Sequence, residues 1–213
     1  MVKHFPGGGP QENGLDPHLY SGRNQNYPGN NFDYHLLPFK DAIKNNLKVI
    51  MPYYGIPIGI TNEDVAMGYN KYILSDLLRE ELGFDGVVCS DWGIISGRHW
   101  GVDNLSIRER YKKSLLAGID QYGGEDDPEH IINLINDNEI SIERINNSVR
   151  RILVNKFDLG LFDNPYVDEK LIKERVATDK NIAFGLDAQR KSIVLLENDG
   201  ILPLKNEQSV FVD

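Results

Sequence analysis

Short apolar runs recur along the chain, and stretches with helical periodicity separate them. The runs lie at 2–5, 47–53, 87–89 and 118–122. Each is too short for a helix, and Val-Val-Cys at 87–89 is typical of a strand buried on both faces. Strands spaced about thirty to forty residues apart, with helices between them, indicate right-handed βαβ units in a parallel sheet. The pattern therefore predicts an α/β fold.

Helices are expected after each of these strands. The expected ranges are 32–45, 69–82, 106–116, 128–138 and 141–157. Pro38 interrupts the first of them. Ser106, with Glu109 three positions later, has the spacing of a capping box at the start of the third. The order of strand and helix thus repeats four times.

The composition changes after the last of these helices. We interpret 1–159 as one domain, 160–179 as a linker and 180–213 as the beginning of a second domain. The second domain would start with a helix at 181–190, a strand or buried helix end at 192–197, and apolar pieces at 202–204 and 210–212. Because the chain opens and closes as if inside strands, we expect a piece of a longer protein and predict no localisation.

The composition limits the classes of partner. Lys and Arg number 23 against 32 Asp and Glu, for a net charge of -9. Nucleic acid and anionic membrane surfaces both require a basic patch, so neither is expected as a partner. No apolar run approaches the roughly 20 residues of a membrane span. The single Cys89 excludes an intramolecular disulfide, and its place in an apolar strand indicates a buried thiol.

Polar residues follow the 87–89 strand abruptly, as Ser-Asp-Trp. An acid at the carboxyl end of a parallel strand lies where α/β folds gather their active-site loops. Asp91 beside Trp92 suits a glycosidase, in which a carboxylate acts on the anomeric carbon and an aromatic ring supports the sugar. The alternative is that Asp91 caps the following helix, since Asp is a favoured N-cap residue.

Two further groups follow strand ends. Lys3 and His4 precede a run of three glycines, and together they can donate hydrogen bonds to sugar hydroxyls or an anion while the glycines allow close approach. The alternative is a flexible turn, and the spacing does not fit a phosphate-binding loop. Tyr53 and Tyr54 follow the second strand, where a hydroxyl can bond to a catalytic carboxylate or a ring can pack as a lid.

Acidic residues in loops leave two questions open. Asp16 and His18 form either a proton-transfer dyad or two solvated side chains. The acids at 125–127 form either a solvated turn or metal ligands, and we favour the turn because no histidine pattern accompanies them. We therefore predict no metal site and no cofactor.

Four segments together resemble glycoside hydrolase family three, the β-glucosidase and β-N-acetylglucosaminidase group. They are Lys-His-Phe-Pro-Gly-Gly-Gly at 3–9, the stretch ending Phe-Asp-Gly-Val-Val-Cys-Ser-Asp-Trp at 77–92, 150–166 and 188–196. The resemblance implies the second half of a (β/α)8 TIM-type barrel, a linker, and the first elements of an α/β sandwich domain.

The resemblance also implies roles for individual residues. Asp91 is similar to the family's nucleophile, Lys3 and His4 to its sugar-binding pair, Tyr53 to a residue beside the nucleophile, and Trp92 to the lining of the neighbouring subsite. The implied activity is that of a retaining exo-β-glycosidase, β-glucosidase-like, which removes terminal non-reducing sugars from an oligosaccharide or β-glycoside through a glycosyl-enzyme. Its two carboxyl groups should lie about 5 Å apart.

The acid/base stays open at this point. Two-domain members of the family use a glutamate of the second domain, whereas single-domain glucosaminidases use an Asp-x-His pair, which Asp16 and His18 match in a loop two residues longer than expected. Two other readings compete with the glycosidase. One is a catalytically incomplete carbohydrate-binding fragment, since four strands leave two open edges that invite self-association or pairing with missing parts of the chain. The other is a metal-dependent barrel hydrolase that uses Asp91 with the acids at 125–127.

Overall fold

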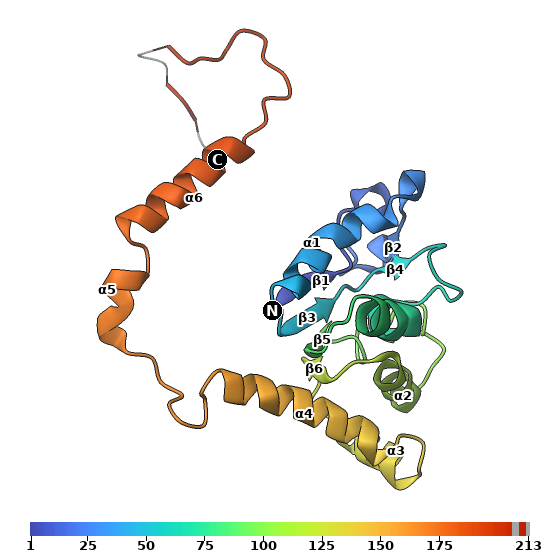
Figure 1. The fold of residues 1–213 in the computed structure, drawn as a ribbon. Helices are drawn as coiled ribbons and strands as arrows, with labels where there is room; N and C mark the ends of the chain where they lie inside the picture. Colours follow the sequence, from blue (N-terminus) through green and yellow to red (C-terminus); the bar gives the residue numbers. More distant parts are fainter. Residues whose placement is uncertain (206–208, 212–213) are drawn as a thin grey trace. The chain divides into compact units, whose positions relative to one another are not determined.

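The structure is a computed structural model of the chain, and it describes residues 1–205 and 209–211. The chain divides into two compact units, Met1–Asn164 and Pro165–Asp213. In the first unit, strands and helices alternate along the chain (Figure 1). Within the described residues, no helix combines the length and apolar character needed to cross a bilayer.

The first unit is built on a sheet of four parallel strands. These are β1 (Val2–Phe5), β3 (Val49–Pro52), β5 (Val87–Trp92) and β6 (Gln121–Gly123), in the spatial order β1-β3-β5-β6. Neighbours in sequence are neighbours in space, which is the strand order of a TIM-type barrel. The predicted α/β class and the four parallel strands are therefore confirmed. Among the described residues, β1 and β6 each pair with one strand of this sheet.

Helices follow the strands of this sheet as predicted, three of them between strands and two after β6. They are α1 (Phe32–Lys44), η5 (Tyr72–Glu81, a π-helical segment), α2 (Ile107–Ala117), α3 (Glu129–Asn136) and α4 (Ile142–Asp158). Pro38 lies inside α1 without ending it. The predicted capping box is present, because the Ser106 hydroxyl accepts from the Glu109 N–H and the Glu109 carboxylate accepts from the Ser106 N–H at 2.8 Å.

The loops contain short elements that the hydrophobic pattern does not reveal. Strands β2 (Asn24–Gln25) and β4 (Ile56–Pro57) pair in parallel as a second, small sheet. Single turns of 3-10 helix form η1 (Glu12–Gly14), η2 (Tyr20–Gly22), η3 (Pro28–Asn30) and η4 (Met67–Tyr69). The β2–β4 pairing ties the long loop after β1 to the segment after β3, and a bridge between Gln11 and Gln25 folds the loop back on itself.

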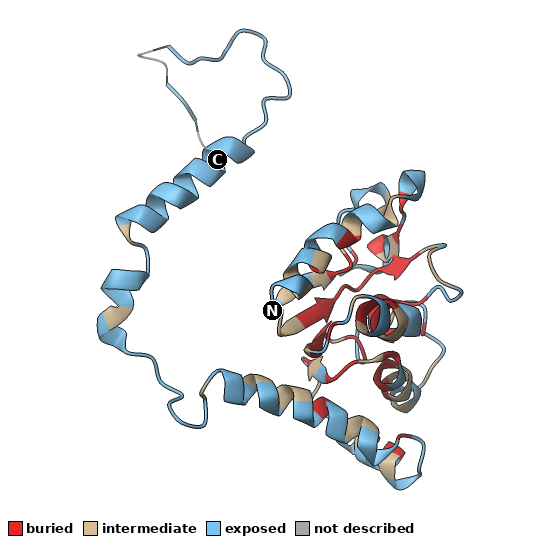
Figure 2. Ribbon diagram, in the orientation of Figure 1, coloured by how far each residue is buried: buried red, intermediate tan, exposed pale blue. Residues whose placement is uncertain are grey.

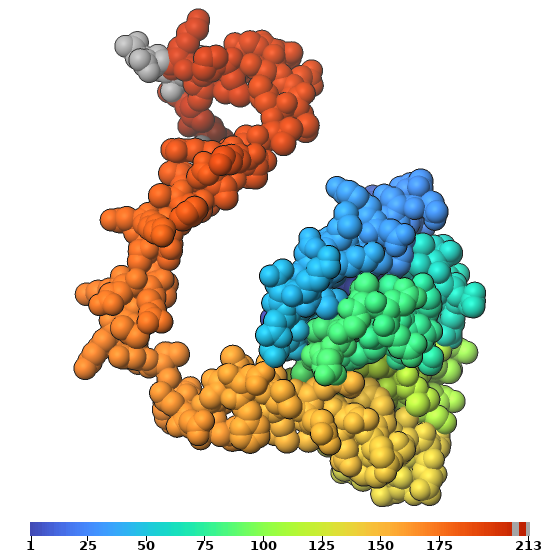
Figure 3. Space-filling model, in the orientation of Figure 1, coloured from blue at the N-terminus to red at the C-terminus, as the bar shows by residue number. Residues whose placement is uncertain are grey.

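The hydrophobic core lies between the sheet and the helices of the first unit. Its fully buried members include Phe5, Ile50 and Val88 from the strands and Ile73 and Leu74 from η5. Figure 2 shows these buried residues concentrated on the strands and on the inner sides of the helices, and Figure 3 shows side chains of helices and loops covering the strands from outside. Since burial of each large apolar side chain stabilises by about 1.5–3 kcal/mol, this core holds the strand ends in place.

A charged cluster lies at the amino-terminal end of the strands. The Asp120 carboxylate, which is wholly buried, accepts hydrogen bonds from Arg79 at 2.6 Å, from Ser148 at 2.6 Å and from the Val88 N–H at 3.0 Å. Two more guanidinium groups, those of Arg144 and Arg151, lie 3.4 and 3.1 Å away. Burial lowers the pKa of Arg79 to about 10, and Asp120 opposes that shift. This cluster fastens η5 and α4 beneath the sheet.

The second unit contains η6 (Glu169–Leu171), α5 (Ile172–Arg175) and α6 (Asp179–Ser192), and none of its described residues is buried (Figure 2). Ser192 ends α6, and residues 193–197 form neither strand nor helix and are exposed. The prediction of a strand or buried helix end at 192–197 is therefore wrong. Of the apolar piece expected at 210–212, residue 212 lies outside the described residues. The division into 1–159, 160–179 and 180–213 stays a prediction.

Candidate active site

The candidate nucleophile lies at the carboxyl end of β5. Asp91 is 7% exposed, and its Oδ1 accepts a hydrogen bond from the Trp92 N–H at 2.7 Å. The next helix, α2, begins sixteen positions later at Ile107 and is capped by Ser106. The alternative role of Asp91 as a helix cap is therefore wrong. The strand end presents a buried carboxylate with one oxygen already held.

His4 faces the second oxygen of this carboxylate. Its Nε2 lies 3.2 Å from Asp91 Oδ2, and that oxygen has no hydrogen-bond partner among the described residues. Burial lowers the pKa of His4, while the charge of Asp91 opposes the shift. The imidazole is thus neutral at pH 7, and a proton on Nε2 can point toward Oδ2. The ends of β1 and β5 are brought together, although 87 positions separate the two residues.

The loop after β1 leaves room beside His4, on the side of α1. Lys3 is exposed, and a cavity of about 440 Å³ lies between it, His4, the glycines that follow and α1. Gly7 has φ +119°, a conformation that side chains disfavour. A Cβ added to Gly8 would lie 3.0 Å from the Tyr53 ring. Gly7 therefore serves the backbone conformation and Gly8 the close packing of Tyr53, and approach of a ligand to these glycines stays a prediction.

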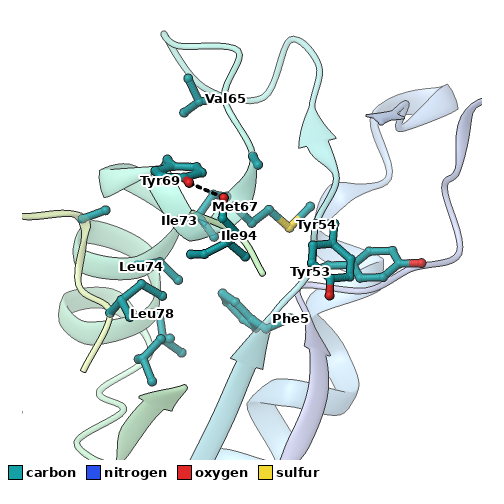
Figure 4. Packing of buried hydrophobic residues seen from close by; sticks show 14 of the residues in the cluster. Phe5, Tyr53, Tyr54, Val65, Met67, Tyr69, Ile73, Leu74, Leu78 and Ile94 are labelled. Atoms are coloured by element: carbon teal, nitrogen blue, oxygen red, sulfur yellow. Dashed lines mark hydrogen bonds between the residues drawn. The ribbon is translucent and has the colours of Figure 1, made fainter. Parts of the chain in front are cut away.

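The two tyrosines after β3 have different partners. The Tyr53 ring lies 4.7 Å from the His4 ring, and its hydroxyl accepts a hydrogen bond from Gln11 at 2.7 Å. The Tyr54 hydroxyl donates to the Trp92 carbonyl at 2.7 Å. Burial first and the Asp91 carboxylate second raise the pKa of Tyr54. Both rings lie at the end of β3 beside the core (Figure 4), and it is Tyr54 whose hydroxyl reaches the Asp91–Trp92 segment.

Asp16 and His18 form a hydrogen-bonded pair in the long loop. His18 Nδ1 lies 2.6 Å from Asp16 Oδ1, and the His18 N–H donates to the same oxygen at 2.8 Å. These two bonds, the backbone one first, lower the pKa of Asp16. The His18 ring packs edge-on against Tyr54 at 4.8 Å, and Trp100 anchors the loop by donating to the Pro17 carbonyl at 2.8 Å. The pair is exposed, but the fold brings it against the candidate site.

Trp92 packs against the end of β6. Its side chain is 54% exposed, and its indole packs on the backbone of Gly123 and Gly124, where an added Cβ would come within 2.6 Å of ring atoms. The ring therefore contacts the end of β6 and is still partly exposed.

Sequence reasoning missed Arg98. Its Nη1 donates to the Trp92 carbonyl at 3.4 Å, and its guanidinium lies 5.2 Å from the centre of the Tyr54 ring. A single arginine in a polar loop carries no periodic or motif signal, so only the tertiary contacts reveal it.

The acids at 125–127 are not arranged as metal ligands. Glu125 Oε1 accepts from the N–H groups of Ile95 at 2.8 Å and Ser96 at 3.1 Å, so it fastens the turn after Trp92. Asp127 lies 3.5 Å from His130 on the surface. Across residues 1–205 and 209–211, no group of three or more His, Cys, Asp or Glu side chains could hold a metal ion.

Comparison with known proteins finds relatives that match nearly the whole chain. The chain is 50% identical to a protein named probable β-glucosidase C from Aspergillus flavus, over 98% of the chain and 35% of that protein. It is 34% identical to the periplasmic β-glucosidase/β-xylosidase of Dickeya chrysanthemi, over 100% of the chain and 36% of that protein. The chain thus spans about a third of the length of these relatives.

Solved structures agree with the sequence comparison. A β-glucosidase from Listeria innocua in complex with isofagomine matches with a TM-score of 0.73 at 27% identity, over 95% of this chain and 27% of that one. The profile of the glycosyl hydrolase family 3 N-terminal domain matches residues 1–154. With the motifs, the parallel sheet and the profile in agreement, the chain belongs to glycosyl hydrolase family 3.

Proposed function

We propose that this chain carries the nucleophile side of the active site of a retaining exo-β-glycosidase, β-glucosidase-like. The observation that supports it best is the Asp91 carboxylate. It is buried at the end of β5, with Oδ1 held by the Trp92 N–H and Oδ2 facing His4 without a hydrogen bond of its own. A carboxylate oriented in this way has one oxygen available to bond to a sugar carbon. The names of the relatives suggest a terminal β-linked glucose or xylose as the sugar.

The proposed reaction has two displacement steps. Asp91 attacks the anomeric carbon, the bond to the leaving-group oxygen breaks, and a general acid supplies a proton to that oxygen. A water molecule then attacks the same carbon, the ester bond to Asp91 breaks, and the water proton passes to the group that acted as acid. The neutral His4 and the cation of Lys3 would hold sugar hydroxyls, and Tyr53 would line the same subsite beside His4. Trp92 would support the leaving group.

Two candidates exist for the acid/base. One is the Asp16–His18 pair, which the fold brings against Tyr54 and thereby near Asp91. The other is a glutamate of a second domain, of which residues 180–213 would be the beginning. We favour the glutamate, because the sequence after the linker at 160–179 resembles the entry to that domain. On this proposal, further segments of the same polypeptide complete the barrel and the site.

A catalytically incomplete carbohydrate-binding fragment is the second candidate function. The observation that favours it is the sheet, in which β1 and β6 each pair with one strand among the described residues. Such edges favour association with another half barrel or with a second copy of the chain.

Trapping of the glycosyl-enzyme tests the proposal directly. The chain is incubated with a 2-deoxy-2-fluoro-β-glucoside bearing an activated leaving group, and any adduct is located by peptide mass spectrometry. Such a reagent needs little acid assistance, so an absent glutamate does not prevent the first step. We expect the adduct on the peptide that contains Asp91, none in Asp91→Asn, and an unchanged adduct in Asp126→Asn, which alters an exposed acid.

The other outcomes decide between the two candidates. A chain that unfolds cooperatively by circular dichroism but forms no adduct is the binding fragment, and the glycosidase assignment is then rejected for this chain. An adduct on a residue other than Asp91 rejects the assignment of the nucleophile. Size-exclusion chromatography of the same sample shows whether two copies associate.

A further inference from the structure

The indole of Trp92 lies against two glycines at the end of β6. An ideal Cβ at Gly123 would lie 2.6 Å from Trp92 Cε3 and 2.9 Å from Cζ3, and one at Gly124 would lie 2.6 Å from Cδ1. Real Cβ atoms do not come so close to ring carbons or, at Gly123, to the Ser90 carbonyl oxygen, which would lie 2.9 Å away. A side chain at either position must therefore shift the indole or the backbone beside it. The end of β6 is thereby shaped to receive this ring.

A second contact joins the same two strand ends. The Gly93 N–H donates to the Gly123 carbonyl at 3.1 Å, which continues the pairing of β5 and β6 past Trp92. The register shifts between Cys89 and Trp92, so the backbone turns where the ring leaves the strand. The direction of the indole is therefore fixed by the β6 end as well as by its own strand.

Glu125 secures the turn that follows Trp92. Its Oε1 accepts hydrogen bonds from the Ile95 N–H at 2.8 Å, the Ser96 N–H at 3.1 Å and the Ser96 hydroxyl at 3.3 Å. Hydrogen bonds to an ionised acceptor are about twice as strong as neutral ones. Residues 123–125 thus contact both the ring of Trp92 and the turn that follows it.

We propose that Gly123, Gly124 and Glu125 are positioning residues that hold the Trp92 indole as a flat platform and so determine which leaving groups the site accepts. The inference rests on the proposed glycosidase function. Because the indole is in close contact with Gly123 and Gly124 while Trp92 is still 54% exposed, its exposed surface is available to a flat partner. The apolar face of a pyranose or an aromatic aglycone has that shape, whereas a small leaving group does not reach the ring.

Tryptophan fluorescence tests the platform without any reaction. The chain has two tryptophans, of which Trp100 is 8% exposed, so acrylamide quenching reports mainly on Trp92. Gly123→Ala should raise the quenching constant, because displacement of the indole from the end of β6 exposes more of the ring. Gly97→Ala is the matched control, since its Cβ meets only the Gly93 carbonyl at 3.6 Å, an ordinary contact. Equal quenching in the two variants overturns the proposal.

A pair of trapping reagents tests the consequence for leaving groups. Dinitrophenyl 2-deoxy-2-fluoro-β-glucoside and the corresponding glycosyl fluoride deliver the same sugar to Asp91, but only the first has an aromatic leaving group. In Gly123→Ala, the ratio of labelling rates, dinitrophenyl over fluoride, should fall roughly two- to tenfold, the usual worth of one aromatic contact. The ratio should not change in Gly97→Ala. An unchanged ratio in Gly123→Ala overturns the proposal, whereas failure of both reagents on the unaltered chain rejects the glycosidase function instead.

A circular dichroism melt shows whether Gly123→Ala folds. If it does not fold, variants of Glu125 test the proposal instead. Glu125→Ala removes all three hydrogen bonds to the turn but adds no atom near the indole. We expect increased quenching and a lowered labelling ratio in Glu125→Ala, and a smaller change in Glu125→Gln, whose amide oxygen can still accept. If Glu125→Ala has the same quenching constant and the same labelling ratio as the unaltered chain, the role assigned to Glu125 is overturned.

Discussion

Replacement of Asp120 by asparagine should destabilise the first unit more than any change at the candidate active site. The carboxylate is wholly buried and is surrounded by three guanidinium groups, a hydroxyl and the Val88 N–H. Asparagine has nearly the same shape but carries no charge, and it presents an amide NH2 toward donors on one side. The substitution therefore leaves cations without a counter-ion while hardly changing the packing.

The contacts give the expected magnitude. Breaking a buried ion pair by removal of one partner costs roughly 3–5 kcal/mol. The side chains of Arg79, Arg144 and Arg151 are 14%, 21% and 26% exposed, so water can solvate them in part. We therefore expect the lower end of that range, about 3 kcal/mol in the free energy of unfolding. With a urea dependence near 2 kcal/mol per molar, the midpoint should fall by about 1.5 M.

Urea unfolding followed by circular dichroism measures this change. Asp85→Asn is the matched control, because the Asp85 side chain is 97% exposed and touches the same cluster only through Arg151 at 3.7 Å. We expect no measurable shift of the midpoint in that variant. If Asp120→Asn and Asp85→Asn unfold at the same urea concentration, the cluster does not hold η5 and α4 to the sheet, and the reasoning is refuted.

Two further predictions concern the candidate active site. Burial outweighs the charge of Asp91 at His4, so its pKa, followed by NMR titration, should lie below 6.5, and Asp91→Asn should lower it further. A folded-state pKa below the unfolded value means that the unfolded chain binds the proton first as the pH decreases. The free energy of unfolding should therefore fall as the pH decreases from 6.5 through the folded pKa. A midpoint of the His4 titration above 6.5 contradicts this prediction. Tyr54→Phe removes the hydrogen bond to the Trp92 carbonyl and should lower the free energy of unfolding, measured in urea, by about 1 kcal/mol. An unchanged stability would show that Arg98 alone satisfies that carbonyl.

Much of the fold is readable from local patterns. The apolar run at 87–89 predicts a strand because no helix is so short, and β5 forms there. Ser106 and Glu109 predict a helix start because the capping box involves only neighbouring residues, and the structure contains both of its hydrogen bonds. The prediction at 192–197 was wrong because a strand depends on residues that are not its neighbours in sequence. The composition of this run suits a strand, but a strand needs a pairing partner, and residues 193–197 have none among the described residues.

The sequence by itself determined the α/β class, the parallel strands and the place of Asp91 at a strand end, because periodicity and motifs act over a few residues. Only the tertiary structure decided which side chains meet there. Tyr54 rather than Tyr53 reaches the Trp92 carbonyl, and His18 packs on Tyr54. The period-two rule that assigns side chains to faces fails where strands bend, and both β1 and β5 shift register at their ends. Side-chain directions at those ends depend on contacts between segments distant in sequence, which no local pattern encodes.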